Sequence, residues 1–515
     1  MNLLRALGTV SSLTLVSRVL GFVRDWVIAR SFGAGMATDA FFVAFRLPNL
    51  LRRMFAEGAF SQAFVPILAE YQRQQSPEET RTLISRVATL LGLVVLAISI
   101  LGMVATPAII WLTAPGFADE ADKFALTVSL TRITFPYIFF MSLVALAGGI
   151  LNTWSRFAIP AFTPALLNIA FIGMSLFAAP YFDEPVRALA WAVLLGGVLQ
   201  LIVQFWPLVK MGLLPRFDFA PADAAVRRIG KLMLPAMLGV SVAQISLVIN
   251  TVFASFLQNG SVSWLYYADR LMEFPAGLLG AALGTILLPG LAKRHADGDA
   301  SGFSRLLDHG LRLALLLTLP AALALALLGA PLLSTLFQHG AFSGEDVRQT
   351  HAALIAYSFG LPGLIAVKIL APGFYARQDI RTPTRFAIIS LCATQAMNAI
   401  FVFGLPRLGL PAHAGLALSI GLASLLNASL LARGLLRRGD YTPQTGWRVF
   451  LLRIALALVA LTAVLVWGAG ETSDWLVAPT RQRIVHLCWL VPAGIGVYFA
   501  ALFALGFRLR DFRRV

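Results

Sequence analysis

Residues 87–112 read VATLLGLVVLAISILGMVATPAIIWL, an uninterrupted run without a charged side chain. A helix needs about 20 apolar residues to cross the hydrocarbon core of a bilayer, so this run is long enough to do so. The whole chain has the same character, because 58% of its 515 residues are hydrophobic and 13% are charged. Soluble domains average about 45–50% apolar and about 25% charged residues. The composition therefore excludes a soluble enzyme, a secreted disulfide scaffold and a disordered regulator, and predicts an all-α polytopic membrane protein.

Apolar runs of this kind recur along the chain between short polar loops. They are continuous and do not alternate over about 10 residues, which disfavours the strands of a membrane barrel. We predict fourteen transmembrane helices at approximately 9–32, 38–69, 84–112, 125–152, 161–180, 186–208, 232–256, 262–292, 306–336, 350–375, 386–404, 412–433, 449–469 and 484–506.

The formal charge of +16 arises from 41 Lys and Arg residues against 25 Asp and Glu residues. In a soluble protein this excess would indicate a nucleic-acid partner. In a polytopic protein, Lys and Arg accumulate in the cytoplasmic loops. The loops on the side of both termini carry 23 of these cations and the opposite loops carry 7. We therefore expect both termini in the cytoplasm and no nucleic-acid partner.

Two blocks of sequence recur at a nearly constant offset. Residues 42–47 (FVAFRL) resemble residues 266–271 (YYADRL), and residues 66–69 (PILA) resemble residues 289–292 (PGLA). A duplication of six spans returns the chain to its starting side, so both copies would share one orientation. We predict two pseudo-repeated six-helix lobes and a two-helix tail, and transporters commonly bind substrate between such lobes. Chance similarity among apolar helices is the alternative. The predicted limits are 1–215, 216–437 and 438–515.

Charged residues inside the spans gather in the first, second and eighth. A charge at mid-membrane costs at least ~2.5–3.5 kcal/mol, so it marks a cavity or pathway by default. Six arginines exceed the five carboxylates, and the planar guanidinium suits a bidentate phosphate contact. This pattern predicts an anion site, for phosphate or pyrophosphate, although any single pair could serve only to fix helix packing. The residues are Arg18, Arg24, Asp25, Asp39, Arg46, Arg52, Arg53, Glu57, Asp269, Arg270 and Glu273.

The sequence holds no motif for chemistry on the substrate. It has no phosphate-binding loop of nucleotide hydrolases, no zinc-protease motif and no nucleophile elbow. The two cysteines lie in apolar runs and the six histidines show no ligand spacing. We therefore expect a transporter and not an enzyme, without a metal or cofactor. A membrane-embedded transferase or hydrolase would need paired Asp or His residues at a membrane face.

Several segments resemble the MurJ/MviN family, the lipid II flippases of the bacterial inner membrane. They are SRVLGFVRD at 17–25, GAGMATDAFFVAF at 33–45, LPNLLRR at 47–53, YADRL at 267–271 and LAPGFY at 370–375. The resemblance runs nearly end to end and is greatest to the proteobacterial branch. It implies the multidrug/oligosaccharidyl-lipid/polysaccharide exporter fold, in which two six-helix lobes form a V around a central cavity. The helices of 438–515 would form an apolar groove for the lipid tail.

The resemblance also implies a substrate and a site. The substrate would be lipid II, the undecaprenyl-pyrophosphate-linked disaccharide-pentapeptide, flipped to the periplasmic leaflet for peptidoglycan synthesis by alternating access. Membrane lipids, and the cell-wall synthesis or division machinery, are further candidate partners. An exporter of another polyprenyl-linked oligosaccharide or of small molecules is the alternative. Arg18, Arg24, Arg52 and Arg270 would line the cavity and hold the pyrophosphate, supported by Asp25, Asp39, Arg53, Glu57, Ser263, Asp269 and Glu273.

Overall fold

A computed structural model describes the backbone of residues 3–53 and 60–508, and the side chains there except those of 3–7, 234–243, 281–283 and 285–286. These residues form helices and no strands, which confirms the predicted all-α class. The chain divides into two compact units, residues 1–260 and 261–515. The repeat limits predicted from the sequence, 1–215 and 216–437, are a different division of the chain and stay a prediction.

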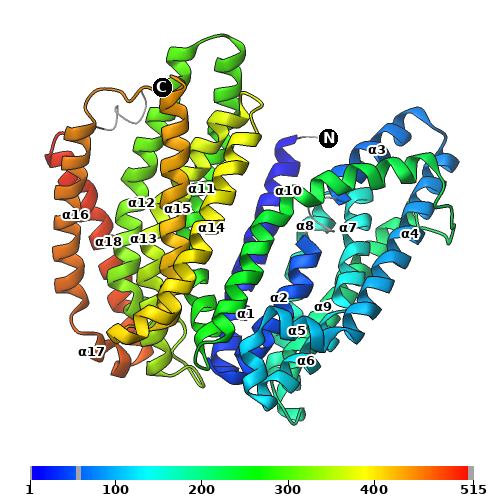
Figure 1. The fold of residues 1–515 in the computed structure, drawn as a ribbon, viewed down its shortest axis with the longest axis horizontal. Coiled ribbons are helices and arrows are strands. Elements are labelled where there is room, and N and C mark those ends of the chain that lie inside the picture. Colours follow the sequence, from blue (N-terminus) through cyan, green and yellow to red (C-terminus); the bar gives the residue numbers. More distant parts are fainter. Residues whose placement is uncertain (1–2, 54–59, 509–515) are drawn as a thin grey trace. The chain divides into compact units, whose positions relative to one another are not determined.

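The first unit contains ten α-helices and three short helical turns within its described residues (Figure 1). Its elements are α1 (Leu3–Phe32), α2 (Met36–Arg52), α3 (Ser61–Gln74), α4 (Pro77–Val104), α5 (Thr106–Thr113), η2 (Pro115–Asp119), α6 (Ala121–Thr134), α7 (Tyr137–Thr153), α8 (Ala158–Gly173), η3 (Met174–Ala178), η4 (Ala179–Tyr181), α9 (Arg187–Lys210) and α10 (Ala224–Ser255).

The second unit begins with a helix of 36 residues, α11, and ends with the helix α18. Its elements are α11 (Ser261–Ala296), α12 (Ala300–Leu336), α13 (Gly344–Tyr375), α14 (Arg381–Gly404), η5 (Leu405–Leu408), α15 (Ala412–Arg437), α16 (Trp447–Ala469), α17 (Thr472–Val477) and α18 (Thr480–Ala504).

Ten helical segments among the described residues are long and apolar enough to cross a membrane. They are α4, α6 with α7, α8 with η3 and η4, α9, α12, α13, α14 with η5, α15, α16 and α18. The other four predicted spans correspond to α1, to α2 with α3, to α10 and to α11. The predicted intramembrane charges lie in or next to α1, α2 and α11, and α1 alone carries Arg5, Arg18, Arg24, Asp25 and Arg30. The total of fourteen spans stays a prediction.

Some predicted spans are divided in the structure. The span predicted at 125–152 consists of α6 and α7, which meet at Pro136. Proline lacks the backbone N–H that would continue the helix, and its ring clashes with the preceding turn. The span predicted at 38–69 contains α2 and α3, and part of the stretch between them, residues 54–59, lies outside the described residues.

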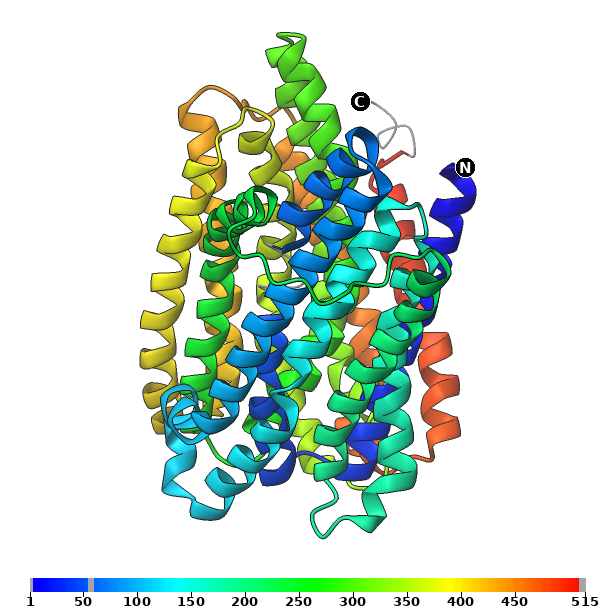
Figure 2. The same cartoon turned by 90° about the vertical axis from the view of Figure 1, so that its right-hand side faces the viewer.

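The core of the first unit lies among α3, α4, α7, α9 and α10. Buried apolar side chains such as Phe64, Ile84, Ile150 and Leu208 meet there. Figure 2 shows α3 and α4, in blue, beside α7, in cyan. One helix of this core, α7, also contacts α2, the helix that ends at Arg52.

In the second unit, α13 packs against α11, α12 and α15 (Figure 1). A separate cluster joins α12 to α16 and α18 through residues such as Leu316, Ile454 and Leu490. The Tyr498 hydroxyl of α18 donates to the Leu316 carbonyl of α12 at 2.8 Å. The two C-terminal helices therefore pack on α12 within their own unit.

Backbones approach closely where α13 crosses α15. A Cβ atom on Gly363 would lie 2.6 Å from the backbone nitrogen of Leu425. Small residues allow such approaches between membrane helices, where packing replaces the hydrophobic driving force.

We expect Gly363→Ala to destabilise the protein by roughly 1–3 kcal/mol, the usual cost of overpacking, because the backbone of α15 must shift. Thermal unfolding of the purified protein in detergent measures this effect. Gly496→Ala on α18 is the matched control, since nothing lies within 4 Å of the added Cβ. Equal melting temperatures for the two variants would contradict the prediction.

Candidate functional site

The predicted arginine of α1, Arg24, is held by its chain neighbour and by α8. Its Nε and Nη2 atoms donate to Oδ1 of Asp25 at 2.9 and 2.6 Å. Its Nη1 atom donates to Oδ1 of Asn168 at 3.1 Å, and the Asn168 amide donates to the Ser17 carbonyl at 3.0 Å. The Asp25 side chain is 1% exposed and that of Arg24 is 12% exposed. Arg24 is thus a nearly buried cation with a defined orientation.

Aromatic rings surround this guanidinium on its other side. The Cζ atom of Arg24 lies 5.5 Å from the ring centroid of Phe171, and that ring meets Phe41 and Phe45 of α2 edge-on. A cation over an aromatic face is attracted by the ring quadrupole. The other predicted arginine of α1, Arg18, is exposed.

Two of the predicted charged residues of α2 meet α10 and the segment after it. The Asp39 side chain is 1% exposed and accepts a hydrogen bond from the backbone N–H of Gly260 at 2.7 Å. Seven residues further, Nη1 of Arg46 donates to Oγ1 of Thr251 at 2.6 Å. These two positions therefore share one face of α2. Arg53 is exposed, and Glu57 lies outside the described residues.

A buried lysine extends this network, and the sequence did not identify it. Lys123 of α6 is one of the seven cations that the sequence assigns to the loops opposite the termini, yet its side chain is 1% exposed. Its ammonium donates to Oδ1 of Asn259 at 2.6 Å and lies 4.0 Å from the ring centroid of Phe117. The Asn259 amide in turn donates to Glu120 at 3.1 Å. No pattern around Lys123 in the sequence distinguishes it from a loop cation.

Arg52 lines a cavity of about 400 Å³ within the first unit. Its Nε atom donates to Oδ1 of Asn49 at 3.0 Å. Opposite polar groups come from α8 and α9, where Nε2 of Gln204 donates to Oγ1 of Thr163 at 3.1 Å. The Gln204 Oε1 atom is buried and has no hydrogen-bond partner among the described residues. The cavity thus combines one cation with amide and hydroxyl groups, a donor set suited to a polar or anionic ligand.

In the second unit the predicted residues lie on α11. Nη1 of Arg270 donates to Oε2 of Glu273 at 2.8 Å, an ion pair one turn apart. The Arg270 and Glu273 side chains are 36% and 58% exposed, and Asp269 is also exposed. Ser263 is 0% exposed. An accessible guanidinium with a replaceable carboxylate partner can bind an anion, whereas Ser263 is fully buried.

The structure therefore joins some of the predicted residues in pairs. Arg24 with Asp25, and Arg270 with Glu273, form ion pairs, while Arg52 lines a cavity of the first unit. Asn168, which bonds to Arg24, and Gln204, which lines the cavity with Arg52, were missed because they are neutral amides in apolar helices. Among the described residues, no group of three or more His, Cys, Asp or Glu side chains could hold a metal ion.

The comparison with known families decides the identity. The family model described as lipid II flippase MurJ matches residues 28–485. The chain belongs to the MurJ family. Lipid II flippase MurJ of Burkholderia cenocepacia is 48% identical over 520 residues, covering 100% of this chain and 99% of that protein. The probable lipid II flippase MurJ of Vibrio cholerae is 43% identical, covering 99% and 98%.

Solved structures agree with this family. A lipid II flippase MurJ in an inward closed conformation is 27% identical and matches with a TM-score of 0.79, covering 98% of this chain and 99% of that chain. An inward-facing MATE family multidrug transporter of the MOP superfamily matches with a TM-score of 0.64 at 14% identity, covering 83% and 98%, which shows the shared fold alone. The MurJ family consists of membrane transporters, so the prediction of a transporter and not an enzyme is confirmed.

Proposed function

We propose that this chain flips lipid II from the cytoplasmic to the periplasmic leaflet of the bacterial inner membrane, for peptidoglycan synthesis. The observation that carries this proposal is 48% identity over the full length to a curated lipid II flippase. The chain also carries the arginine motifs at 17–25 and 47–53, which we assign to the pyrophosphate. Its apolar helices supply the membrane spans that a path across the bilayer requires.

The pyrophosphate would be held by Arg18, Arg24, Arg52 and Arg270. Two of them, Arg24 and Arg270, already pair with carboxylates, at 2.6 and 2.8 Å. A pyrophosphate can bind a guanidinium as a carboxylate does and carries more charge. It can therefore displace the exposed Glu273 from Arg270, and it can share Arg24 with the buried Asp25. The supporting residues would be Asp25, Asp39, Arg53, Glu57, Ser263, Asp269 and Glu273.

Release would follow the reverse exchange. Once the opening has passed from the cytoplasmic to the periplasmic side, Glu273 re-pairs with Arg270, and Asp25 competes with the pyrophosphate for its arginine. The polyprenyl tail would stay in lipid or follow the helices of 438–515, where α18 exposes apolar side chains such as Ile495 and Phe499. The driving force would be an ion gradient, the membrane potential or a partner, because the sequence has no hydrolytic motif.

The same proposal includes the arrangement of the chain in the membrane. We propose fourteen spans, which form two six-helix lobes around a central cavity and two C-terminal helices, with both termini in the cytoplasm. Alternating access requires two lobes that rock about the substrate, and repeated lobes of one orientation supply them. Contact with the cell-wall synthesis or division machinery is a further part of it.

Depletion of the protein in its host tests the function directly. We expect lipid II to accumulate in the inner leaflet, and a lipid II translocation assay to show the loss of periplasmic exposure. Running this assay with and without the membrane potential identifies the driving force. Accumulation of a different polyprenyl-linked saccharide, with normal lipid II exposure, would favour the alternative exporter and overturn the proposal.

A further inference from the structure

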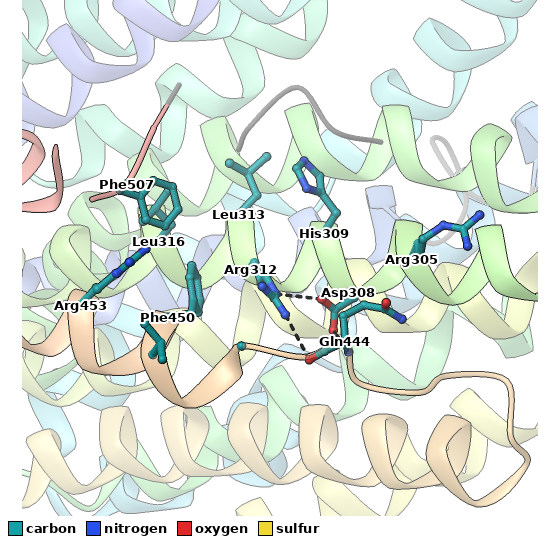
Figure 3. A pocket seen from close by; sticks show the side chains of 12 residues that line it. Arg305, Asp308, His309, Arg312, Leu313, Leu316, Gln444, Phe450, Arg453 and Phe507 are labelled. Carbon is teal, nitrogen blue, oxygen red and sulfur yellow. Dashed lines mark hydrogen bonds and ion pairs between the residues drawn. The ribbon is translucent and has the colours of Figure 1, made fainter. Parts of the chain in front are cut away.

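A second polar pocket lies within the second unit, and none of its lining residues is one of the arginines assigned to the pyrophosphate. It has a volume of about 570 Å³ and is formed by the N-terminal half of α12, the first two turns of α16, Gln444, Gly446 and Phe507 (Figure 3). We call it the α12–α16 pocket. It is lined by Arg305, Asp308, His309, Arg312, Leu313, Leu316, Gln444, Gly446, Val449, Phe450, Arg453 and Phe507.

The charge of the pocket is unbalanced. Three arginines, Arg305, Arg312 and Arg453, line it with a single carboxylate, that of Asp308. Nε of Arg312 lies 2.8 Å from Oδ2 of Asp308, so this arginine is neutralised. Arg305 donates to the hydroxyl of Ser301 at 3.1 Å and is attracted by the carboxylate of Asp299, which lies outside the pocket lining. Arg453 forms no hydrogen bond or ion pair within the described part of the chain. The lining therefore keeps an excess of positive charge, to which the guanidinium of Arg453 contributes most directly.

Asp308 is not available to neutralise this excess. Its Oδ1 atom accepts hydrogen bonds from the Tyr441 hydroxyl at 2.8 Å, the Gln444 backbone N–H at 3.1 Å and the Trp447 indole at 2.7 Å. These three donors and Arg312 fix the carboxylate in place. Its side chain is 4% exposed.

The backbone adds a further preference for anions. Gly446 immediately precedes α16 and lines the pocket, and no side chain caps this end of the helix. The first N–H groups of a helix have no partner within it and carry partial positive charge, which favours a phosphate. Arg453 lies about two turns into the same helix and lines the same pocket. An anion in the pocket would therefore be attracted both by its guanidinium and by the N-terminus of α16.

The rest of the pocket is apolar, so a free inorganic anion would use only half of it. Leu313, Leu316 and Phe450 form this part with Phe507, whose ring centroid lies 6.1 Å from that of Phe450. From Val449 an exposed apolar stripe continues along α16 through Leu452, Leu456 and Val459. Their spacing of three and four residues places them on one helical face. An acyl chain that starts at the pocket could follow this face through the bilayer.

We propose that the α12–α16 pocket binds the phosphate head group of an anionic glycerophospholipid, with the acyl chains along α16. Basic pockets between membrane helices at a membrane surface are suited to anionic head groups. Two candidate spans, α12 and α16, begin near the pocket and a third, α18, ends near it, so the proposal places the pocket at the level of the head groups. The bound lipid is a resident of the bilayer and is separate from the transported substrate.

Lipid binding to the purified full-length protein tests the proposal. Native mass spectrometry with phosphatidylglycerol as the probe would compare wild type with Arg305→Gln/Arg453→Gln. Each basic residue near an anionic surface contributes about 1 kcal/mol, and 1.4 kcal/mol corresponds to tenfold. We therefore expect the double variant to bind phosphatidylglycerol about tenfold more weakly or worse, with an unchanged melting temperature.

Three comparisons make the result specific. Arg448→Gln removes a charge from the first turn of the same helix but outside the pocket lining, and should leave the affinity unchanged. Phosphatidylcholine with the same acyl chains should show no difference between wild type and the double variant. Equal losses in the double variant and Arg448→Gln would reduce the effect to general surface charge and overturn the proposal. Preferential binding of undecaprenyl phosphate at this pocket would also overturn it, since the occupant would then be the carrier lipid.

Discussion

Replacing Arg24 by alanine is expected to abolish growth of a strain that depends on this protein as its only flippase, at normal expression. The change removes a guanidinium that we assign to the pyrophosphate. It also takes the cation away from Asp25, whose side chain is 1% exposed. Removing one member of a buried pair costs about 3–5 kcal/mol. The measurement is complementation, with protein abundance in the membrane determined in parallel.

Two further variants separate binding from folding at this position. Arg24→Lys keeps the charge but loses the planar fork, so we expect partial complementation at most. In Arg24→Ala/Asp25→Asn both charges are absent and stability should be partly restored. Growth should stay lost if Arg24 binds the substrate. Full growth of this double variant, or of Arg24→Ala alone, would refute the assignment of Arg24 to the site.

Arg270→Ala is the second variant expected to abolish complementation, with little loss of stability. The Arg270–Glu273 pair is at least one-third exposed on both sides, and such pairs contribute about 0–1 kcal/mol. A loss of growth with normal abundance and an unchanged melting temperature would therefore report on function. The translocation assay in proteoliposomes provides the direct readout.

The chain offers a matched control for Arg270. Arg348 forms the same kind of ion pair with Glu345, one turn apart on α13, at 2.6 Å and with both side chains more than half exposed. Arg348→Ala removes an equivalent charge outside the predicted site and should complement fully. If Arg270→Ala complements as well as Arg348→Ala does, the proposed role of α11 in substrate binding is wrong.

The sequence predicted the all-α class well, because this class depends on local composition. Long uncharged runs such as 87–112 become helices wherever a bilayer is their solvent. The position of Arg24 next to Asp25 was likewise visible in the chain itself. The break between α6 and α7 at Pro136 is also a local effect, but it was not predicted because the apolar run continues through the proline.

The partners of the site residues could not be predicted in the same way. Asn168 lies 144 residues from Arg24 and Thr251 lies 205 residues from Arg46, so only the packing of α1 on α8 and of α2 on α10 brings them together. Lys123 shows the same limit, since burial by the segment after α10 turns an apparent loop cation into a core residue. The charge pattern of the sequence shows which helices carry embedded charges. Tertiary packing decides which polar groups become the hydrogen-bond partners of those charges.

Asp308 has a mechanical consequence for the second unit. The segment from Tyr441 to Trp447 connects α15 to α16, and three of its groups donate to this one carboxylate on α12. These hydrogen bonds hold the connection against α12, so it cannot act as a free hinge. Any displacement of α12 is transmitted to the start of α16. The C-terminal helices would therefore move together with α12 and not independently of it.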